Sequence, residues 1–325
     1  MKIEEFLEEW NNDSPYVEVK TSGSTGQPKL MLVEKQRMLA SARITCDFLG
    51  LKSGDSALLC MSLDYIAGKM MVIRSLERGL RLITVEPSGH PLNNCQFSIA
   101  NSQLDFAAMV PMQVYNSLQV PEEKERLKQI QHLIIGGGAI DAAMEKELRG
   151  FPNAVWSTYG MTETLSHIAL RRISSAEASE WYTPFDTVKL STTDEGCLVV
   201  DAPEVCADIL TTNDIVELKP DGRFRVLGRK DNVICSGGIK IQIEEVERQL
   251  KPYFRVPYLL TKRHDHKFGE VAVLLTEGSV DEARQICEIR LPKFYQPKDY
   301  IHVETIPLTE TGKPARKIAE QLASK

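Results

Sequence analysis

Segments with strand periodicity alternate with segments of helical periodicity over the first half of the chain. Residues 34–49 place apolar side chains at helical spacing, and Gly50 follows where a helix could end. Residues 56–61 are typical of a strand, 66–76 of a helix and 80–85 of a second strand. This alternation predicts a mostly parallel sheet and therefore an α/β fold.

Three further short strands are predicted at residues 106–110, 131–135 and 154–157, with charged helical segments at 122–129 and 141–148 between them. Ligands of parallel α/β sheets lie beyond the carboxyl ends of the strands. Two of these strands lead directly into loops that contain glycine. The loops are Gly136-Gly137-Gly138 and Tyr159-Gly160, and we expect them to share one crevice.

A stretch of hydroxyl residues and glycines lies between the strand-like segment 16–19 and the helical segment 34–49. It reads Thr21-Ser22-Gly23-Ser24-Thr25-Gly26-Gln27-Pro28-Lys29. Backbone N–H groups, hydroxyl groups and one ammonium group can all donate to the same anion there. The spacing fits neither a Walker A loop nor a dinucleotide-binding loop nor a nucleophile elbow. Composition alone would also fit a flexible linker, but the flanking elements favour a phosphate-binding loop.

Composition excludes several classes of function. The chain has 325 residues, of which 42% are hydrophobic and 26% charged, as in a soluble globular protein of about two domains. The formal net charge of -6 argues against nucleic-acid binding. Seven cysteines occur singly, so we expect reduced thiols and a cytoplasmic location. We expect no export signal and no membrane insertion, because no apolar run reaches membrane-spanning length.

The sequence pattern changes twice in the second half of the chain. From about residue 186, short alternating strands with turn signals predict a small β subdomain. Gly228-Arg229-Lys230-Asp231 then precedes a segment of small residues and a helical pattern at 242–250. We therefore expect a large domain at residues 1–228, followed by a small α+β domain at 229–325.

Seven short motifs occur in the order that the adenylate-forming superfamily shows. This superfamily contains acyl-CoA synthetases, peptide-synthetase adenylation domains and luciferases, and the resemblance covers the chain from about residue 16 to its end. The run 228–247 is most similar to o-succinylbenzoate-CoA ligases of menaquinone biosynthesis. The seven matching segments are residues 21–29, 136–139, 159–163, 212–214, 228–232, 236–247 and 312–313.

The resemblance implies a ligase that uses ATP, Mg²⁺ and CoA. A carboxylate is a poor electrophile, so it first attacks the α-phosphate of ATP to give an acyl-adenylate, and diphosphate leaves. By resemblance, donors of the loop hold the β- and γ-phosphates, and Lys29 supplies a mobile positive charge. These donors are Thr21, Ser22, Gly23, Ser24, Thr25 and Gly26.

The same resemblance assigns the rest of the ATP site. Tyr159 packs on adenine, and Gly138 with Ala139 forms the adjoining wall. Asp214 accepts from the ribose hydroxyls, and Arg229 donates nearby. Taken alone, Tyr159 would fit an ordinary aromatic residue at a strand end, and Asp214 would fit a structural turn residue.

Three more residues are implied to act in catalysis. Thr162 and Glu163 follow the adenine-packing tyrosine, and Glu163 is the implied Mg²⁺ ligand because Mg²⁺ prefers hard oxygen ligands. Lys313 would bridge the attacking carboxylate and the α-phosphate. Taken alone, Thr162-Glu163 would fit the start of a helix, and Lys313 would fit a solvated turn.

A lysine from the small domain cannot stay in the site while CoA enters, so the resemblance implies two poses of that domain. Asp231 corresponds to the hinge residue of this rotation. In the second pose, Gly238 and Lys240 would line the passage for CoA. The alternative for the glycine pair before Ile239 is a tight turn.

The chain departs from the superfamily pattern at two places. Relatives carry a sizeable subdomain ahead of the phosphate loop, which here begins at residue 21. The front of the large domain is thus expected to be shortened, and a second subunit of a homodimer could cover its sheet edges. Tyr65 stands where many relatives have a histidine that gates the acid. His167 would either border the acyl pocket or serve packing.

We therefore expect an acid-thiol ligase that joins a small carboxylic acid to CoA, with o-succinylbenzoate as the acid. Two alternatives stay open within catalysis: a different aryl or acyl acid, or a carrier protein in place of CoA. A third alternative is a non-catalytic paralogue that binds nucleotide or acyl-adenylate. The shortened front and Tyr65 favour this third alternative, whereas the retained Lys29, Glu163 and Lys313 oppose it.

Overall fold

A computed structural model describes residues 1–20, 30–93, 104–308 and 314–324. A seven-stranded sheet has the order β4-β3-β5-β6-β7-β8-β9. Strands β4 to β7 are parallel, whereas β8 and β9 are antiparallel to their neighbours, which confirms the α/β class with a mostly parallel sheet. The strands are β3 (Ser56–Leu59), β4 (Arg81–Thr84), β5 (Leu104–Met109), β6 (Ile130–Ile135), β7 (Ala154–Gly160), β8 (His167–Arg172) and β9 (Thr183–Pro184).

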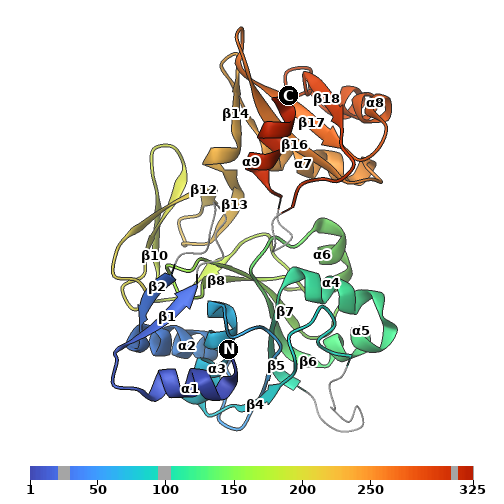
Figure 1. The fold of residues 1–325 in the computed structure, drawn as a ribbon. Helices are drawn as coiled ribbons and strands as arrows, with labels where there is room; N and C mark the ends of the chain where they lie inside the picture. The colour runs from blue at the N-terminus through green and yellow to red at the C-terminus, as the bar shows by residue number, and fades with distance from the viewer. Residues whose placement is uncertain (21–29, 94–103, 309–313, 325) are drawn as a thin grey trace. The chain divides into compact units, whose positions relative to one another are not determined.

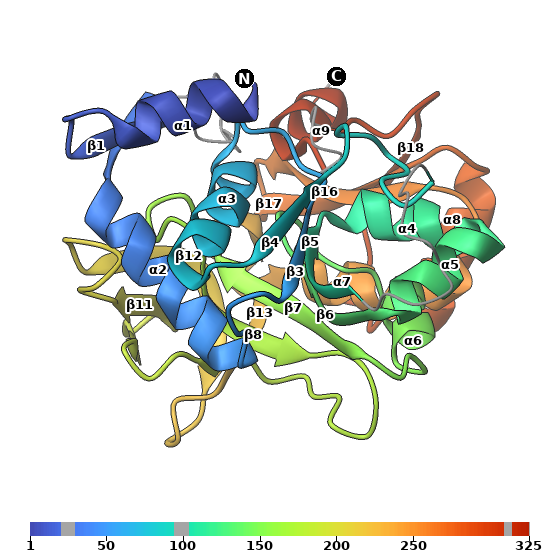
Figure 2. The same ribbon diagram turned by 90° about the horizontal axis from the view of Figure 1, so that it is seen from below.

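Helices cover both faces of this sheet (Figures 1 and 2). Two lie on one face and three on the other, as a chain of alternating strands and helices requires. Gly50 and Gly79 end the first two, each in the left-handed conformation with φ of 68°. The helices are α2 (Lys35–Leu49) and α3 (Ile66–Arg78) on the first face, and α4 (Pro111–Gln119), α5 (Pro121–Lys128) and α6 (Ala142–Leu148) on the second.

The core between the sheet and α4 to α6 fixes the ends of the central strands. Met109, Ile135 and Val155 of three neighbouring strands belong to one buried cluster, together with Met144 and Leu148 of α6. Burying an apolar side chain of this size contributes about 1.5–3 kcal/mol. The loops that follow β6 and β7 therefore start from well-packed positions.

A short helix and a two-stranded antiparallel sheet precede the large sheet. Helix α1 (Ile3–Asn11) leads to β1 (Tyr16–Lys20), which pairs antiparallel with β2 (Leu30–Glu34). The buried ammonium group of Lys69 in α3 donates to the Glu9 carboxylate at 3.0 Å and to the Glu18 carbonyl at 2.7 Å. Helix α1 and strand β1 are therefore fastened to α3.

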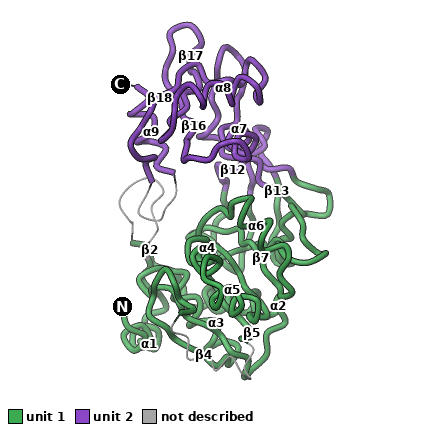
Figure 3. The backbone as a smooth tube through the Cα atoms, turned by 90° about the vertical axis from the view of Figure 1, so that its right-hand side faces the viewer, with its two compact units in different colours: residues 1–191, 200–210, 218–225 green, residues 192–199, 211–217, 226–325 purple. Residues whose placement is uncertain are grey.

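The chain forms two compact units (Figure 3). The first contains residues 1–191, 200–210 and 218–225, and the second contains residues 192–199, 211–217 and 226–325. A four-stranded sheet in the order β10-β11-β12-β13 follows the large sheet, where the small β subdomain is predicted. Its strands are β10 (Lys189–Thr192), β11 (Cys197–Asp201), β12 (Leu210–Leu218) and β13 (Phe224–Arg229).

The end of the chain forms an α+β arrangement around a five-stranded sheet. Ile234, Val246, Leu274 and Cys287 lie in its buried core. No helix within the described ranges is long and apolar enough to cross a bilayer. The elements are β14 (Val233–Ser236), β15 (Ile239–Gln242), β16 (Tyr258–Asp265), β17 (Gly269–Thr276), β18 (Asp299–His302), α7 (Ile243–Leu250), α8 (Val280–Arg290), α9 (Arg316–Ala323) and the 3-10 helices η1 (Lys230–Asn232) and η2 (Lys251–Tyr253).

Candidate functional site

Of the two glycine-containing segments predicted to share a crevice, Gly136-Gly137-Gly138 follows β6, and Tyr159-Gly160 ends the adjacent parallel strand β7. Gly136 starts the first loop, and its N–H donates to the Met109 carbonyl at 3.0 Å. A Cβ atom on Gly136 would lie 2.5 Å from Thr158 Oγ1, so with a larger residue either the loop or the Thr158 side chain would have to shift. Gly138 is half-buried and Ala139 is exposed. The structure thus places the first residue of this loop beside Thr158 of β7.

Tyr159 lies within β7, because this strand continues to Gly160, three residues beyond its predicted end. The register against β8 shifts between these two residues. The half-buried Tyr159 ring makes T-shaped contacts with Phe224 and Tyr182, at centroid distances of 5.0 and 5.9 Å. Contacts of this geometry fix the orientation of a ring. Tyr159 is therefore a firmly held aromatic surface at the carboxyl end of a parallel strand.

Thr162 and Glu163 lie in the turn between β7 and β8, and no helix follows them. The Thr162 carbonyl accepts from the N–H of Leu165 at 2.9 Å, which closes the turn. Glu163 is exposed, and its carboxylate forms no hydrogen bond or ion pair with another described residue. Its free oxygens fit a Mg²⁺ ligand. Within the part of the chain that the structure describes, no group of three or more His, Cys, Asp or Glu could hold a metal ion.

A buried chain of hydrogen bonds passes through His167. Thr45 donates to the Ser41 carbonyl at 3.1 Å, so its oxygen accepts from His167 Nε2, also at 3.1 Å. His167 Nδ1 then accepts from the Ser166 hydroxyl at 3.2 Å, and Ser166 accepts from Arg74 at 2.6 Å. Burial, and secondarily the Arg74 charge, hold the pKa of His167 well below its usual value, so its imidazole is neutral.

Arg74 is a functional candidate that the motifs did not reveal. It is 2% exposed, its Nε atom lacks a partner, and it forms no ion pair with a carboxylate of the described residues. Burial lowers the pKa of its guanidinium to about 10. An unpaired buried cation is costly unless an anion joins it. The signal in the sequence was a lone arginine at the end of the apolar run 70–73.

The two acyl-pocket candidates of the first unit differ in exposure. Tyr65 is the N-cap of α3, the helix that carries Arg74, and its side chain is 45% exposed. His167 is 7% exposed and borders a cavity of about 10 Å³, which has room for about one water molecule. The other lining residues include Ile44, Phe185 and Val188, so this cavity is mainly apolar.

In the second unit, one arginine connects two predicted carboxylates. Arg229 at the end of β13 contacts Asp214 at 3.3 Å and Asp231 at 3.0 Å. Asp214 lies inside β12, so it is not a turn residue. Asp231 lies in η1, the short helix that joins β13 to β14. The structure thus gathers the predicted ribose ligand, its neighbour and the predicted hinge residue.

The predicted CoA residues lie in a hairpin of the second unit. Gly237 and Gly238 form the two-residue turn between β14 and β15, with φ of 57° and 86°. Two consecutive positive φ values favour glycine at both positions. Lys240 is exposed on β15, opposite Cys235. The tight turn predicted as the alternative is therefore present, and the role of Gly238 and Lys240 in CoA binding stays a prediction.

The remaining predicted residues lie outside the described ranges. They are the phosphate-loop residues Thr21, Ser22, Gly23, Ser24, Thr25, Gly26 and Lys29, and the lysine of the last motif, Lys313.

Comparisons with known proteins agree with the motif order. Residues 4–205 match a family model described as AMP-binding enzyme. The chain is 26% identical over 354 aligned residues to a 2-succinylbenzoate–CoA ligase of Bacillus cereus (strain ATCC 10987 / NRS 248), an alignment that covers 97% of the chain and 72% of the relative.

Two solved structures extend this similarity. An acyl-CoA synthetase (AMP-forming)/AMP-acid ligase II-like protein from Dyadobacter fermentans DSM 18053 is 29% identical, with a TM-score of 0.67 and coverage of 98% of this chain and 93% of that one. The o-succinylbenzoate CoA synthetase from Bacillus subtilis, in complex with its acyl-adenylate intermediate, is 24% identical, with a TM-score of 0.78 and coverage of 95% and 69%. At that identity the second likeness shows the fold alone.

Proposed function

The chain belongs to the AMP-binding enzyme family, and from this premise we propose that it is an ATP-dependent carboxylate-CoA ligase that acts through an acyl-adenylate. We further propose o-succinylbenzoate as its acid, which gives o-succinylbenzoyl-CoA, AMP and diphosphate. The family match supports the use of the nucleotide, and the 2-succinylbenzoate–CoA ligase similarity supports the acid and the CoA acceptor.

The proposed chemistry gives each predicted nucleotide-site residue a role. Tyr159 packs on adenine beside Gly138 and Ala139, and Asp214 accepts from the ribose with Arg229 nearby. The carboxylate of the acid attacks the α-phosphate, and the diphosphate leaves with the negative charge that develops. Bound Mg²⁺ would neutralise part of this charge, and Glu163 beside Thr162 would hold it.

The proposed second step needs the other residues of the second unit. CoA attacks the acyl carbon through its thiol, and AMP leaves. We propose that residues 229–325 rotate about Asp231 between the steps, and that Gly238 and Lys240 then line the path of CoA. Lys313 would act in the first step only, because it would leave the site on rotation.

The observation that carries the choice of acid is the buried Arg74. o-Succinylbenzoate has two carboxylates, and only one of them reacts. The second carboxylate needs a positive partner away from water, because a buried charge without one is costly. Arg74 lies next to His167, one of the acyl-pocket candidates, and the described residues offer it no carboxylate. Its guanidinium can bind a carboxylate with two parallel hydrogen bonds.

Diphosphate release tests this proposal directly. The purified chain is incubated with ATP, Mg²⁺ and one acid at a time, with and without CoA: o-succinylbenzoate, benzoate, a medium-chain fatty acid and several amino acids. We expect release with o-succinylbenzoate and a CoA thioester as the product. Release with another acid would replace the substrate, and an acyl-adenylate that CoA does not consume would favour a carrier protein. Binding of ATP without release for any acid would favour the non-catalytic alternative.

Replacing Arg74 by methionine tests the acid specificity. We expect the KM for o-succinylbenzoate to rise by about tenfold to a hundredfold, since a charge-assisted hydrogen bond is lost, while benzoate is used as before. Lys69→Met on the same helix is the matched control, because Lys69 is equally buried but already paired with Glu9. This control should affect both acids equally. Equal effects of Arg74→Met on both acids would refute the assignment.

A further inference from the structure

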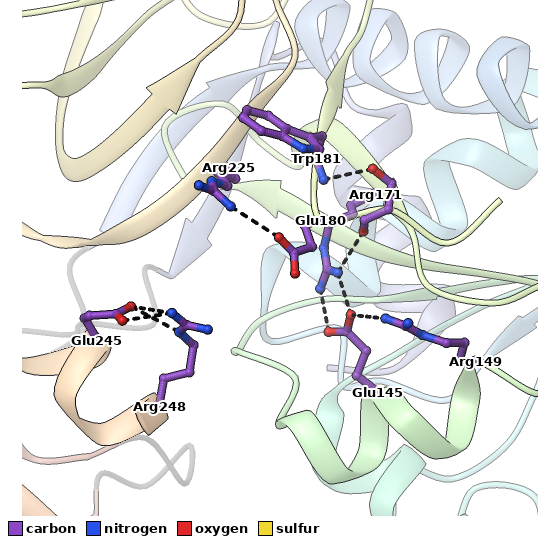
Figure 4. Close-up of polar contacts among 9 residues, drawn as sticks. Glu145, Arg149, Arg171, Glu180, Trp181, Arg225, Glu245 and Arg248 are labelled. Atoms are coloured by element: carbon purple, nitrogen blue, oxygen red, sulfur yellow. Dashed lines mark hydrogen bonds and ion pairs between the residues drawn. The ribbon is translucent and has the colours of Figure 1, made fainter. Parts of the chain in front are cut away.

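A half-buried ion pair connects helix α6 to strand β8 in the first unit (Figure 4). Arg171 of β8 donates to both carboxylate oxygens of Glu145 in α6, at 2.8 and 2.9 Å. It also donates to the Ser179 carbonyl at 3.0 Å. Helix α6 begins three residues after Ala139, and Arg171 lies opposite Ser157 of β7. The pair therefore links the end of one loop to the strand that carries the other.

A series of aromatic contacts leads from this pair to Tyr159. The guanidinium of Arg171 lies 5.5 Å from the ring centroid of Tyr182. The Tyr182 hydroxyl is hydrogen-bonded to Ser157 at 2.8 Å, and its ring stacks on Phe224 at 5.4 Å. Both rings make T-shaped contacts with Tyr159. Arg171 contacts the Tyr182 ring, and Tyr182 and Phe224 pack against Tyr159, so the position of Tyr159 depends on this series of contacts.

Stability alone does not account for this arrangement. The side chains of Arg171 and Glu145 are 11% and 20% exposed, and an ion pair this buried often stabilises a fold no more than apolar residues would. What a two-point contact between guanidinium and carboxylate supplies is orientation. The hydrogen bond from Arg171 lowers the pKa of Glu145, so the pair stays charged at neutral pH.

We propose that Arg171 is a positioning residue of the nucleotide site. With Glu145 and Tyr182, it fixes the gap between the Tyr159 ring and the backbone wall at 138–139. This proposal rests on the proposed function, since it presumes that adenine binds between Tyr159 and residues 138–139. A base between a ring and a backbone wall is held in one position, so a looser gap weakens the binding of adenine nucleotides and lets the base shift away from the groups that recognise its edge. The acid site is not part of this network.

The test compares Arg171→Gln with the wild-type chain in nucleotide binding and in steady-state kinetics. Calorimetry with the full chain measures the Kd for ATP and for GTP, and kinetics measures the KM for ATP and for the acid. We expect the Kd and KM for ATP to rise about tenfold, as a displaced site residue causes. The preference for ATP over GTP should shrink, while the KM for the acid should change less than about twofold. Arg171→Lys, which keeps the charge, should restore part of the ATP affinity.

Arg149→Gln is the matched control. Arg149 approaches the same Glu145 carboxylate, but at 4.0 Å and with a side chain that is 61% exposed. A contact of this kind contributes little, so we expect all constants to stay near the wild-type values. A large effect of this variant would mean that the charge of Glu145, and not its link to Arg171, matters.

The outcomes separate the inference from the proposed function. An Arg171→Gln chain with lower thermal stability but unchanged ATP affinity and base preference would overturn the positioning role, as would equal changes for ATP and the acid. If Arg171→Gln does not fold, Tyr182→Leu interrupts the same contacts and is judged by the same constants. A wild-type chain that binds no ATP would overturn both. A wild-type chain that binds ATP but activates no acid would overturn the ligase proposal, and the binding measurements would still decide the role of Arg171.

Discussion

His167 shows how a single residue can be functional and structural at once. Its neutral imidazole accepts at Nδ1 and donates at Nε2, so it connects Thr45 to Ser166 and, through Ser166, to Arg74. Protonation at Nδ1 would remove the acceptor that Ser166 uses and would place a second positive charge beside Arg74. The fold therefore requires the neutral form.

Because the fold requires a neutral His167, the free energy of unfolding should depend on pH. An unfolded histidine has a pKa of about 6.5, whereas burial holds the pKa of His167 well below this value. Below pH 6.5, the unfolded chain takes up a proton that the folded chain excludes, so the free energy of unfolding falls as the pH falls. His167 should add up to about 1.4 kcal/mol per pH unit to this slope, and its contribution should be constant above pH 6.5.

Denaturant unfolding of the wild type and of His167→Gln between pH 5 and 7.5 measures this slope. The variant should be less stable throughout, but its stability should fall less steeply below pH 6.5. Burial also lowers the pKa of His132, and this contribution cancels because both proteins keep His132. Parallel curves for the two proteins would mean that His167 is not held neutral by the fold.

Residue types and their order predicted the family, but not the partners of each residue. Tyr159 and Glu163 stand in a motif that sequence alone identifies. The rings around Tyr159 and the pairing of Arg171 with Glu145 depend on β7, β8 and α6 meeting in three dimensions. Arg74 was missed for the same reason: a helical arginine is usually exposed, and only packing shows that this one is buried.

At the scale of elements, the close approach of α3 to the end of β3 places Tyr65 and Arg74. A Cβ atom on Gly68 would lie 2.3 Å from the Ser62 carbonyl oxygen, so glycine permits this approach. We expect Gly68→Ala to lower the free energy of unfolding by about 1–3 kcal/mol, because backbone must move to relieve the overlap. Chemical denaturation measures this loss.

Gly150→Ala is the control for this substitution. The nearest atom to a Cβ there is the Glu147 carbonyl oxygen at 3.7 Å, an ordinary contact. Its free energy of unfolding should stay within about 0.5 kcal/mol of the wild type. If Gly68→Ala were equally mild, α3 would be free to move away from the strand end.

Periodicity predicted most elements of the large sheet, because alternation of apolar and polar residues is a local property. The strand at 131–135 and the helices at 34–49 and 141–148 agree with β6, α2 and α6 within one residue at each end. Helix α4 was not predicted, since its first residue is Pro111 and its buried side chains include Gln113 and Ser117. Gln113 bonds the Cys60 and Ser88 carbonyls, contacts that come from distant segments.

At the scale of the whole molecule, the division into units was beyond what local sequence could give. The sequence pattern placed one boundary after residue 228, whereas two earlier segments, 192–199 and 211–217, group with the end of the chain. Because the second unit is assembled from three separate segments, no single change of composition along the sequence marks where it begins. The proposed rotation about Asp231 can be tested by measuring the two half-reactions, formation of the acyl-adenylate and formation of the thioester, separately.

Lys313 and Asp231 should affect opposite half-reactions. Lys313→Ala should abolish formation of the acyl-adenylate, because the proposed bridge between carboxylate and α-phosphate is lost, yet it should use supplied acyl-adenylate nearly normally. Asp231→Pro should do the reverse, since proline fixes φ near −65° and would hold the adenylating pose. Diphosphate release measures the first step, and thioester formation from supplied acyl-adenylate measures the second.

The control for Asp231→Pro is Asp231→Ala, which removes the contact with Arg229 but leaves the backbone free to rotate. If the backbone at this position is the hinge, the alanine variant should form thioester at close to the wild-type rate, and the proline variant should not. Equal losses in both variants would assign the effect to the ion pair with Arg229. Normal thioester formation by Asp231→Pro would place the hinge elsewhere, and loss of both half-reactions in Lys313→Ala would remove the reason for proposing two poses.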